Sequence, residues 1–140
     1  MTPSPSDRPS AEAPRRLALG MGCESGAPAG DLLALATLAL VEAGLDPAWL
    51  EALATIDGKR EEPAMGAVAA HYGIPLRFFD APALERETPR LKNPSDRVFR
   101  LVGCHGVAEA AALAAAGRHA VLVVPKRKSG FATVAIAEIL

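Results

Sequence analysis

The chain has 140 residues, of which 50% are hydrophobic, 4% aromatic and 22% charged, and its formal net charge is −1. This length predicts one domain, and the near-neutral charge gives no reason to expect nucleic acid or an anionic membrane as a partner. The two cysteines are too few for a disulfide framework, which is typical of a reduced, cytoplasmic setting.

The first segment, MTPSPSDRPSAEAPRR, is rich in proline and serine. We expect residues 1–15 to form a disordered tail and residues 16–140 to form a single α/β domain. The tail lacks the apolar centre of a secretory signal, and the chain contains no run of about 18 apolar residues. We therefore expect neither export nor a membrane span.

Apolar periodicity predicts alternating strands and helices in the first part of the chain. Strands are expected at 16–20, 53–57 and 75–79, helices at 31–43 and 63–72, and one or two helical turns at 81–87. Gly44 and Gly73 are expected to end the two longer helices, and Asp46 to cap a short helix that begins at Pro47. Abundant alanine implies that the helices lie close to the sheet.

The second part begins with TPRLKNPSDR, residues 88–97, which predicts a loop that acts as a mobile lid. VFRLVG, residues 98–103, follows as a short strand or an extended segment. We expect a helix at 107–117, a fully buried strand at 120–124 and a last strand at 132–139. The predicted fold is α/β, with a mostly parallel sheet of about five strands flanked by helices and the last strand as an antiparallel edge.

Ligands of such sheets bind beyond the carboxyl ends of the strands, where a glycine-rich turn follows the first strand. Gly20, Gly22 and Gly26 form G-x-G-x-x-x-G, one residue longer than the dinucleotide fingerprint, and no Gly-Lys-Ser/Thr follows. The pattern therefore favours neither a dinucleotide site nor a P-loop. Its free N–H groups could bind an anion, or the turn could only pack the helix on the sheet.

Three further clusters carry charge or nucleophiles. TIDGKREEP contains Lys59, for which we find no structural role, whereas acidic residues at the helix start favour the helix dipole. VGCHG contains Cys104 and His105, and His105 is either a general acid or base or a polar turn residue. VPKRKSG contains a run of three cations, residues 126–128, which belongs either to a solvated hairpin or to a contact for an acidic ligand.

Five stretches, taken together and in this order, resemble the C-terminal domain of the cobalamin-biosynthesis protein G family, which is cobalt-precorrin-5A hydrolase. They are GMGCESG, TIDGKREEPAM, YGIPLRFFDAPALE, NPSDRVFRLVGCHGVAEAAAL and VPKRKSGFATVAIA. The resemblance covers residues 16–140, and the same domain also occurs alone as cobalamin-biosynthesis protein E. It implies an α/β fold and a role in building the corrin ring of vitamin B12.

In the fused hydrolase the reaction opens a δ-lactone on the macrocycle and releases acetaldehyde. The resemblance covers only the C-terminal part of that enzyme, so it does not by itself carry the activity over. It implies a protein that binds a polycarboxylate precorrin or corrinoid intermediate. Two alternatives stay open: a hydrolase that acts on a corrinoid lactone, and a domain that docks to another enzyme of the cobalamin pathway.

The family's glycine–cysteine motif falls on Gly20, Gly22 and Cys23, and Glu24 replaces the basic residue that usually follows the cysteine. The remaining motif positions are Asp57, Lys59, Glu62, Asn93, Pro94, Ser95, Gly103, Val107, Glu109, Ala110, Pro125, Lys126 and Thr133. From this pattern and the local cations we predict the ligand-binding residues Gly20, Gly22, Cys23, Asp57, Lys59, Ser95, Gly103, Lys126, Lys128 and Thr133.

Precorrins carry acetate and propionate arms, which a groove with Lys59, Lys126, Arg127 and Lys128 would complement. For the hydrolase alternative, Glu62 or Glu109 would be the base, and Lys59 or glycine-turn N–H groups would polarise the carbonyl. No cofactor is expected. No metal is expected either, because Cys23, Cys104 and His105 lack the spacing of a zinc site.

Overall fold

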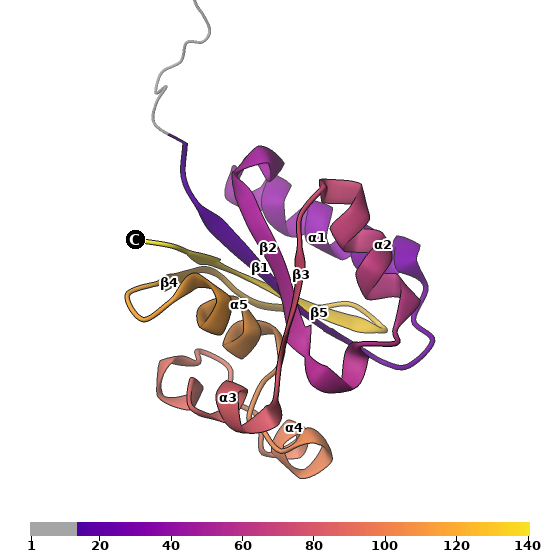
Figure 1. Cartoon of the computed structure of the whole chain (residues 1–140), viewed down its shortest axis with the longest axis vertical. Helices are drawn as coiled ribbons and strands as arrows, with labels where there is room; N and C mark the ends of the chain where they lie inside the picture. The colour runs from indigo at the N-terminus through magenta and orange to yellow at the C-terminus, as the bar shows by residue number, and fades with distance from the viewer. Residues whose placement is uncertain (1–13) are drawn as a thin grey trace, which may run out of the picture.

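A five-stranded sheet in the order β3-β2-β1-β5-β4 forms the middle layer of the computed structural model, which describes residues 14–140 (Figure 1). The strands are β1 (Leu17–Cys23), β2 (Leu50–Ile56), β3 (Leu76–Phe79), β4 (Val121–Lys128) and β5 (Ala132–Glu138). β1 pairs in parallel with β2 and β2 with β3, whereas β5 is antiparallel to both of its neighbours. The predicted α/β class and the five-stranded, mostly parallel sheet are confirmed.

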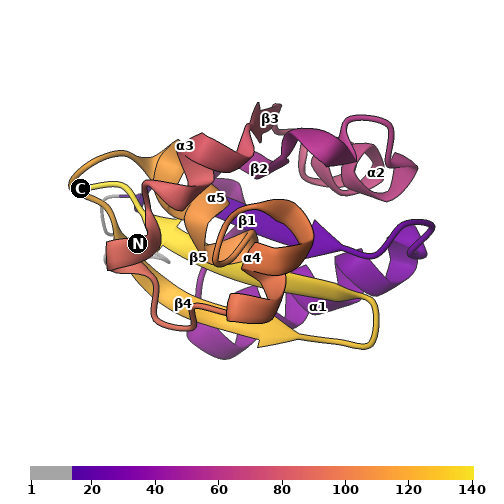
Figure 2. The ribbon, with the colours of Figure 1, turned by 90° about the horizontal axis from the view of Figure 1, so that it is seen from below.

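Helices cover both faces of this sheet (Figures 1 and 2). One face carries α1 (Ala29–Ala43) and α2 (Pro63–Tyr72), and the other carries α5 (Ala108–Ala116) with the short helices α3 (Ala81–Glu85) and α4 (Asp96–Val102). Three single turns of 3-10 helix complete the chain: η1 (Pro47–Trp49), η2 (Asp57–Lys59) and η3 (Thr88–Arg90). In the described residues, no helix has the combined length and apolarity needed to cross a bilayer.

The helix ends follow the sequence signals closely. Gly44 and Gly73 end α1 and α2 in the left-handed conformation, with φ of 68° and 67°. Asp46 accepts a hydrogen bond from the Ala48 N–H at 2.9 Å and caps η1, with Pro47 in the first position. The helix expected at 63–72 is confirmed at both ends.

The alanine-rich helix α5 lies directly on β1, as the abundance of small residues implied. A Cβ added at Gly20 would stand 2.1 Å from the Ala108 carbonyl oxygen and 2.6 Å from the Ala112 nitrogen. Gly20 therefore allows the helix backbone to approach the strand, and its position is explained by packing. This close approach sets the α5 N-terminus over the carboxyl end of β1.

Three expectations for the second half were wrong in detail. Residues 98–103 are not extended: Ser95 caps a helix by accepting a hydrogen bond from the Val98 N–H at 3.2 Å, and that helix is α4. The strand expected at 120–124 continues to Lys128, and most of its residues are partly or fully exposed. β4 thus lies at one edge of the sheet, where Pro125 is tolerated. The last strand, β5, is antiparallel as expected, but it lies between β1 and β4 and not at an edge.

Residues 1–13, most of the expected tail, lie outside the described residues. Arg15, the last residue of the expected tail, is described, and its guanidinium forms two hydrogen bonds with the Glu138 carboxylate, at 2.8 and 2.9 Å. This pair ties the chain before β1 to the end of β5.

Candidate functional site

A cleft of about 530 Å³ opens at the carboxyl ends of β1 and β4, between α4 and the β4–β5 hairpin. We call it the lysine cleft, because Lys59, Lys126 and Lys128 all line it. Its size suits a small-molecule site, and it lies where ligands bind in sheets of this kind. The cleft brings together most of the predicted ligand-binding residues: Gly22, Cys23, Lys59, Ser95, Lys126, Lys128 and Thr133.

The three lysines reach the cleft from two separate elements. Lys59 closes η2, directly after β2, and its side chain is only 18% exposed, with Nζ 4.0 Å from Glu62 Oε1. Lys126 and Lys128 are two residues apart on β4, so their side chains share a face. Arg127 points to the other face, where it pairs with Glu42 of α1. The expectation that Arg127 belongs to the same groove was therefore wrong.

The floor of the lysine cleft is the end of β1. A Cβ added at Gly22 would lie 3.0 Å from Thr133 Oγ1 and 3.3 Å from the Val107 side chain. A larger residue at this position would therefore crowd the floor of the cleft. Cys23 is half-buried beside it. Burial raises the pKa of the Cys23 thiol; the charge of Lys59 opposes this and that of Glu62 adds to it. The thiol is thus predominantly protonated at neutral pH.

Glu62 connects the glycine turn after β1 with the η2 turn after β2, behind the cleft. Its Oε2 accepts a hydrogen bond from the Gly26 N–H at 2.9 Å, and its Oε1 faces Lys59. The side chain is 11% exposed and does not line the lysine cleft. One N–H of the glycine turn is therefore occupied by this carboxylate. Of the described residues that line the cleft, only Glu24 is acidic.

Glu109 is a buried carboxylate in the first turn of α5, with 2% of its surface exposed. It accepts hydrogen bonds from the backbone N–H groups of Lys92, Asn93 and Lys126 and from Asn93 Nδ2, at 2.8 to 2.9 Å. Burial alone would raise the pKa of Glu109, but these donors together lower it. A carboxylate with four donors holds the loop and β4 in place and has little capacity left to act as a base.

Three predicted site residues serve the backbone or the surface instead of lining the cleft. Gly20 lies beneath α5, as described above. Asp57 forms an exposed ion pair with Arg60 at 2.9 Å. Gly103 ends α4 with φ of 86°, in the left-handed region that favours glycine. Each of these positions thus has a local structural explanation.

The lysine cleft also has an apolar wall, formed mainly by α4, which the sequence motifs did not predict. Val98, Leu101 and Val102 of α4 and Phe131 of the hairpin line the cleft, with Arg97 at the start of the helix. Leu101 is 70% exposed. The spacing i, i+3, i+4 of the three α4 residues is the helical signal that could have revealed this wall.

His105 and Cys104 stand outside the cleft. His105 Nδ1 lies 2.9 Å from Glu85 Oε2, and Nε2 lies 3.4 Å from Asp96 Oδ1. Cys104 is buried in the core beside α5, and burial raises its pKa, partly offset by a hydrogen bond to the Gly106 carbonyl. Within residues 14–140, His, Cys, Asp and Glu side chains nowhere form a group of three that could hold a metal ion.

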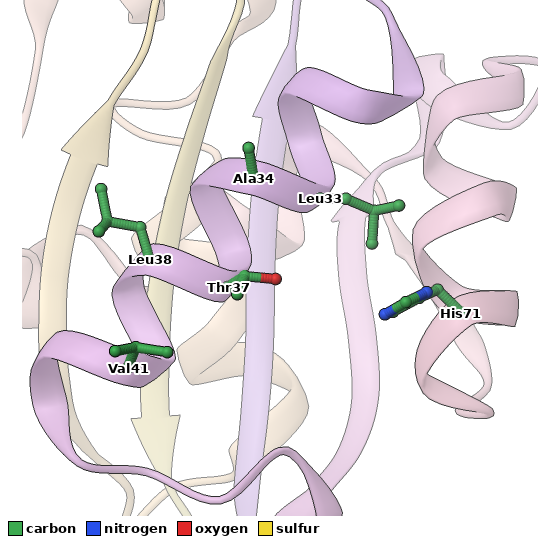
Figure 3. Close-up of a pocket in the computed structure, with 6 residues that line it drawn as sticks. All are labelled: Leu33, Ala34, Thr37, Leu38, Val41 and His71. Carbon is green, nitrogen blue, oxygen red and sulfur yellow. The ribbon is translucent and has the colours of Figure 1, made fainter.

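A second depression, of about 460 Å³, lies on the outer surface between α1 and α2 (Figure 3). Figure 3 shows Leu33 and His71 facing each other across the gap, with Leu38 and Val41 on the exposed side of α1. In the part of the chain that the structure describes, no lysine, arginine or carboxylate lines this depression, and none of the predicted site residues does. We therefore place the candidate site in the lysine cleft.

Comparison with known proteins places residues 17–137 in the family described as cobalamin synthesis G C-terminus. Protein CobE from a Sinorhizobium species is 52% identical over 121 residues, which are 86% of this chain and 79% of that protein. A cobalt-precorrin-5A hydrolase from Priestia megaterium is 33% identical over 124 residues, 89% of this chain. The matched region is 32% of the hydrolase, so this chain corresponds to about a third of it.

The fold agrees with these relationships. The crystal structure of CobE, a protein from the cobalamin (vitamin B12) biosynthetic pathway, matches with a TM-score of 0.84 and 42% sequence identity. The match covers 91% of this chain and 93% of that one. Thus the likeness extends over nearly the whole described structure.

Proposed function

The chain belongs to the cobalamin synthesis G C-terminal family, and on that premise we propose that it binds a corrin-ring intermediate with free carboxylates in the lysine cleft. The observation that carries the proposal is the convergence of Lys59, Lys126 and Lys128 on one cleft. Within residues 14–140, Glu24 is the only acid that lines the cleft. A cleft with this excess of positive charge selects an anionic ligand although the whole chain is nearly neutral.

The chemistry of the ligand class fits the two unlike walls. Corrin-ring intermediates combine a broad apolar macrocycle with carboxylate arms around its rim. The arms would pair with the lysine ammonium groups, and the ring would cover the apolar side chains of α4 and Phe131. Lys59 is the strongest of these contacts, because its side chain is only 18% exposed and an enclosed ion pair is screened less than an exposed one.

Hydrolysis of a corrinoid lactone is the second candidate, favoured by the similarity to the Priestia megaterium hydrolase. In this scheme water attacks the lactone carbonyl, the ring C–O bond breaks, and a carboxylate and a hydroxyl result. Lys59, which lines the cleft, would stabilise the negative charge on the carbonyl oxygen. Glu62 lies behind it, with Oε1 4.0 Å from Lys59 Nζ, and would take up the proton of the attacking water through one intervening water molecule. Glu109 is not part of this scheme, since its oxygens are occupied.

Titration with hydrogenobyrinic acid, a metal-free corrin with free carboxylates, tests the binding proposal. Absorbance of the ring should show saturable 1:1 binding that weakens as salt is added, because the ion pairs are screened. Absence of binding to the protein alone would contradict the proposal. Binding that appears only when another pathway enzyme is present would favour the docking alternative.

Mass spectrometry separates binding from hydrolysis. A lactone-bearing precorrin incubated with the protein should be recovered unchanged if the protein only binds. Addition of one water to the ligand, with or without the loss of acetaldehyde that the fused hydrolase releases, would establish the hydrolase instead if a Glu62→Gln variant does not cause it. A cytoplasmic location, expected from the two unpaired cysteines, stays a prediction.

A further inference from the structure

The helix α4 is attached to the rest of the protein in an unusual way. None of its residues is buried, and Phe99, Leu101 and Val102 are all exposed by 40% or more. Apolar side chains normally hold a helix against its core, but here they leave much of their surface in water. Figure 2 shows α4 in front of α5, and Figure 1 shows α4 at the bottom of the molecule, with α1 near the top. Its present position therefore owes little to hydrophobic burial.

Contacts at the two ends of α4 hold it in place. We call this set of contacts, made by Glu85, Ser95, Phe99 and His105, the neck. The Ser95 N–H donates to the His105 carbonyl at 2.7 Å, closing residues 95–105 into a loop. The Glu85 carboxylate of α3 accepts a hydrogen bond from the His105 N–H at 3.0 Å and contacts its ring at Nδ1. The Phe99 ring stacks on the His105 ring, with centroids 4.5 Å apart.

The segment before this neck is firmly anchored. Arg90 donates to the carbonyls of Gly117, Arg118 and Ala120 at 3.1 to 3.2 Å, and Glu109 binds the N–H groups of Lys92 and Asn93 at 2.9 Å. The sequence predicted a mobile lid at residues 88–97. The contacts instead fix residues 90–93 and leave α4 as the part that can move on its neck.

We propose that α4 is the apolar wall of the lysine cleft and closes over the face of the bound ligand, pivoting at His105. Leu101 and Val102 then determine the preference for a ligand that has an apolar face as well as carboxylates. The inference rests on the proposed function, because it takes the corrin ring as the occupant. The continuity of these side chains with the lysine-lined wall is what points to that occupant.

The energetic reason for closure is the exposed apolar surface. In the free protein the Leu101 side chain is 70% exposed, so most of its apolar surface is in contact with water. A bound macrocycle offers an apolar face against which this side chain can be buried. The lysines alone would accept any polyanion, whereas the α4 wall favours an amphipathic ring.

Leu101→Ser and Val41→Ser form a matched pair of variants for the test. Both residues are exposed on helices, by 70% and 69%, but Val41 lies on α1, outside the lysine cleft (Figure 3). Serine adds no charge beside the carboxylates. Leu101→Ser should weaken binding of hydrogenobyrinic acid roughly tenfold, because the ligand no longer buries a leucine side chain, while Val41→Ser leaves the affinity unchanged.

Hydrogen exchange supplies the second measurement. Amides in residues 96–102 should exchange more slowly when hydrogenobyrinic acid is bound to the unaltered protein, and amides of α1 should not change. Equal affinity of the three proteins, or unchanged exchange in 96–102 upon binding, would overturn the α4 proposal while leaving the binding function intact. No binding by the unaltered protein would overturn the proposed function and this inference together.

Discussion

The buried carboxylate of Glu109 accepts a hydrogen bond from the backbone N–H of Lys126 at 2.8 Å. This contact joins the first turn of α5 to the strand that supplies two of the cleft lysines. The same carboxylate also binds the loop at Lys92 and Asn93. Glu109 thus ties β4 and the loop before α4 to the start of α5, without lining the lysine cleft itself.

Replacing Glu109 with alanine should destabilise the protein strongly. The substitution leaves the part-buried N–H groups of Lys92, Asn93 and Lys126 without this acceptor, at a cost of roughly 1–3 kcal/mol for each group that water cannot reach. We expect chemical denaturation to show a loss of about 3 kcal/mol or more in the free energy of unfolding. A loss below about 1 kcal/mol would contradict the role assigned here.

The ionisation of Glu109 should also make stability depend on pH. The folded protein holds the pKa of this carboxyl below its ordinary value, so the folded state favours the ionised form. The resulting stabilisation is complete above the unfolded pKa and is lost as the pH falls through the folded one, in the region below about pH 4. Glu109→Gln should flatten this part of the stability profile, measured by thermal unfolding at successive pH values.

Lys59→Ala should weaken ligand binding more than any change at the opposite end of the sheet. The Lys59 side chain is largely enclosed, and truncating it beside a bound carboxylate should cost roughly 1.5–3 kcal/mol, or about ten- to a hundredfold in affinity. Arg118→Ala is the control, because Arg118 is exposed in the turn before β4. Equal affinities in a titration with hydrogenobyrinic acid would mean that the site lies elsewhere.

The two cysteines should differ in reactivity. Cys23 is half-buried at the floor of the cleft, whereas Cys104 is fully buried in the core. Burial raises the pKa of both thiols, so alkylation should be slow at neutral pH and faster in alkaline solution. Iodoacetamide should label Cys23 first, and bound hydrogenobyrinic acid should protect it. Labelling of Cys23 at the same rate with and without ligand would argue against occupation of the floor.

Gly20→Ala and Gly66→Ala should change stability in opposite directions. A methyl group at Gly20 would lie 2.1 Å from the Ala108 carbonyl oxygen and would force α5 away from the sheet. We expect this to lower the free energy of unfolding by about 1–3 kcal/mol. At Gly66, exposed in α2, nothing lies within 4 Å, so alanine should stabilise the helix by roughly 0.5–1 kcal/mol. Differential scanning calorimetry provides the comparison, and a neutral Gly20→Ala would refute the close packing.

The sequence alone was sufficient for the features that depend on neighbouring residues. The helix at 63–72 ends where a glycine follows and begins at a proline, and both signals act within one turn. The family resemblance also came from the sequence, and the comparisons confirm it. Most of the predicted ligand residues line one cleft because glycine turns and lysines follow the strands, whose carboxyl ends meet.

Only the tertiary structure decided which side chains share a surface. Lys126 and Arg127 are adjacent in sequence, yet the pleat of β4 sends one to the cleft and the other to Glu42. Glu109 has the residue type of a possible base, but hydrogen-bond donors from two segments distant in sequence occupy its carboxylate. The local sequence of residues 98–103 is compatible with a strand or a helix. The Ser95 cap and the hydrogen bond between Ser95 and the His105 carbonyl favour the helix, and the second of these contacts exists only after the chain has folded back.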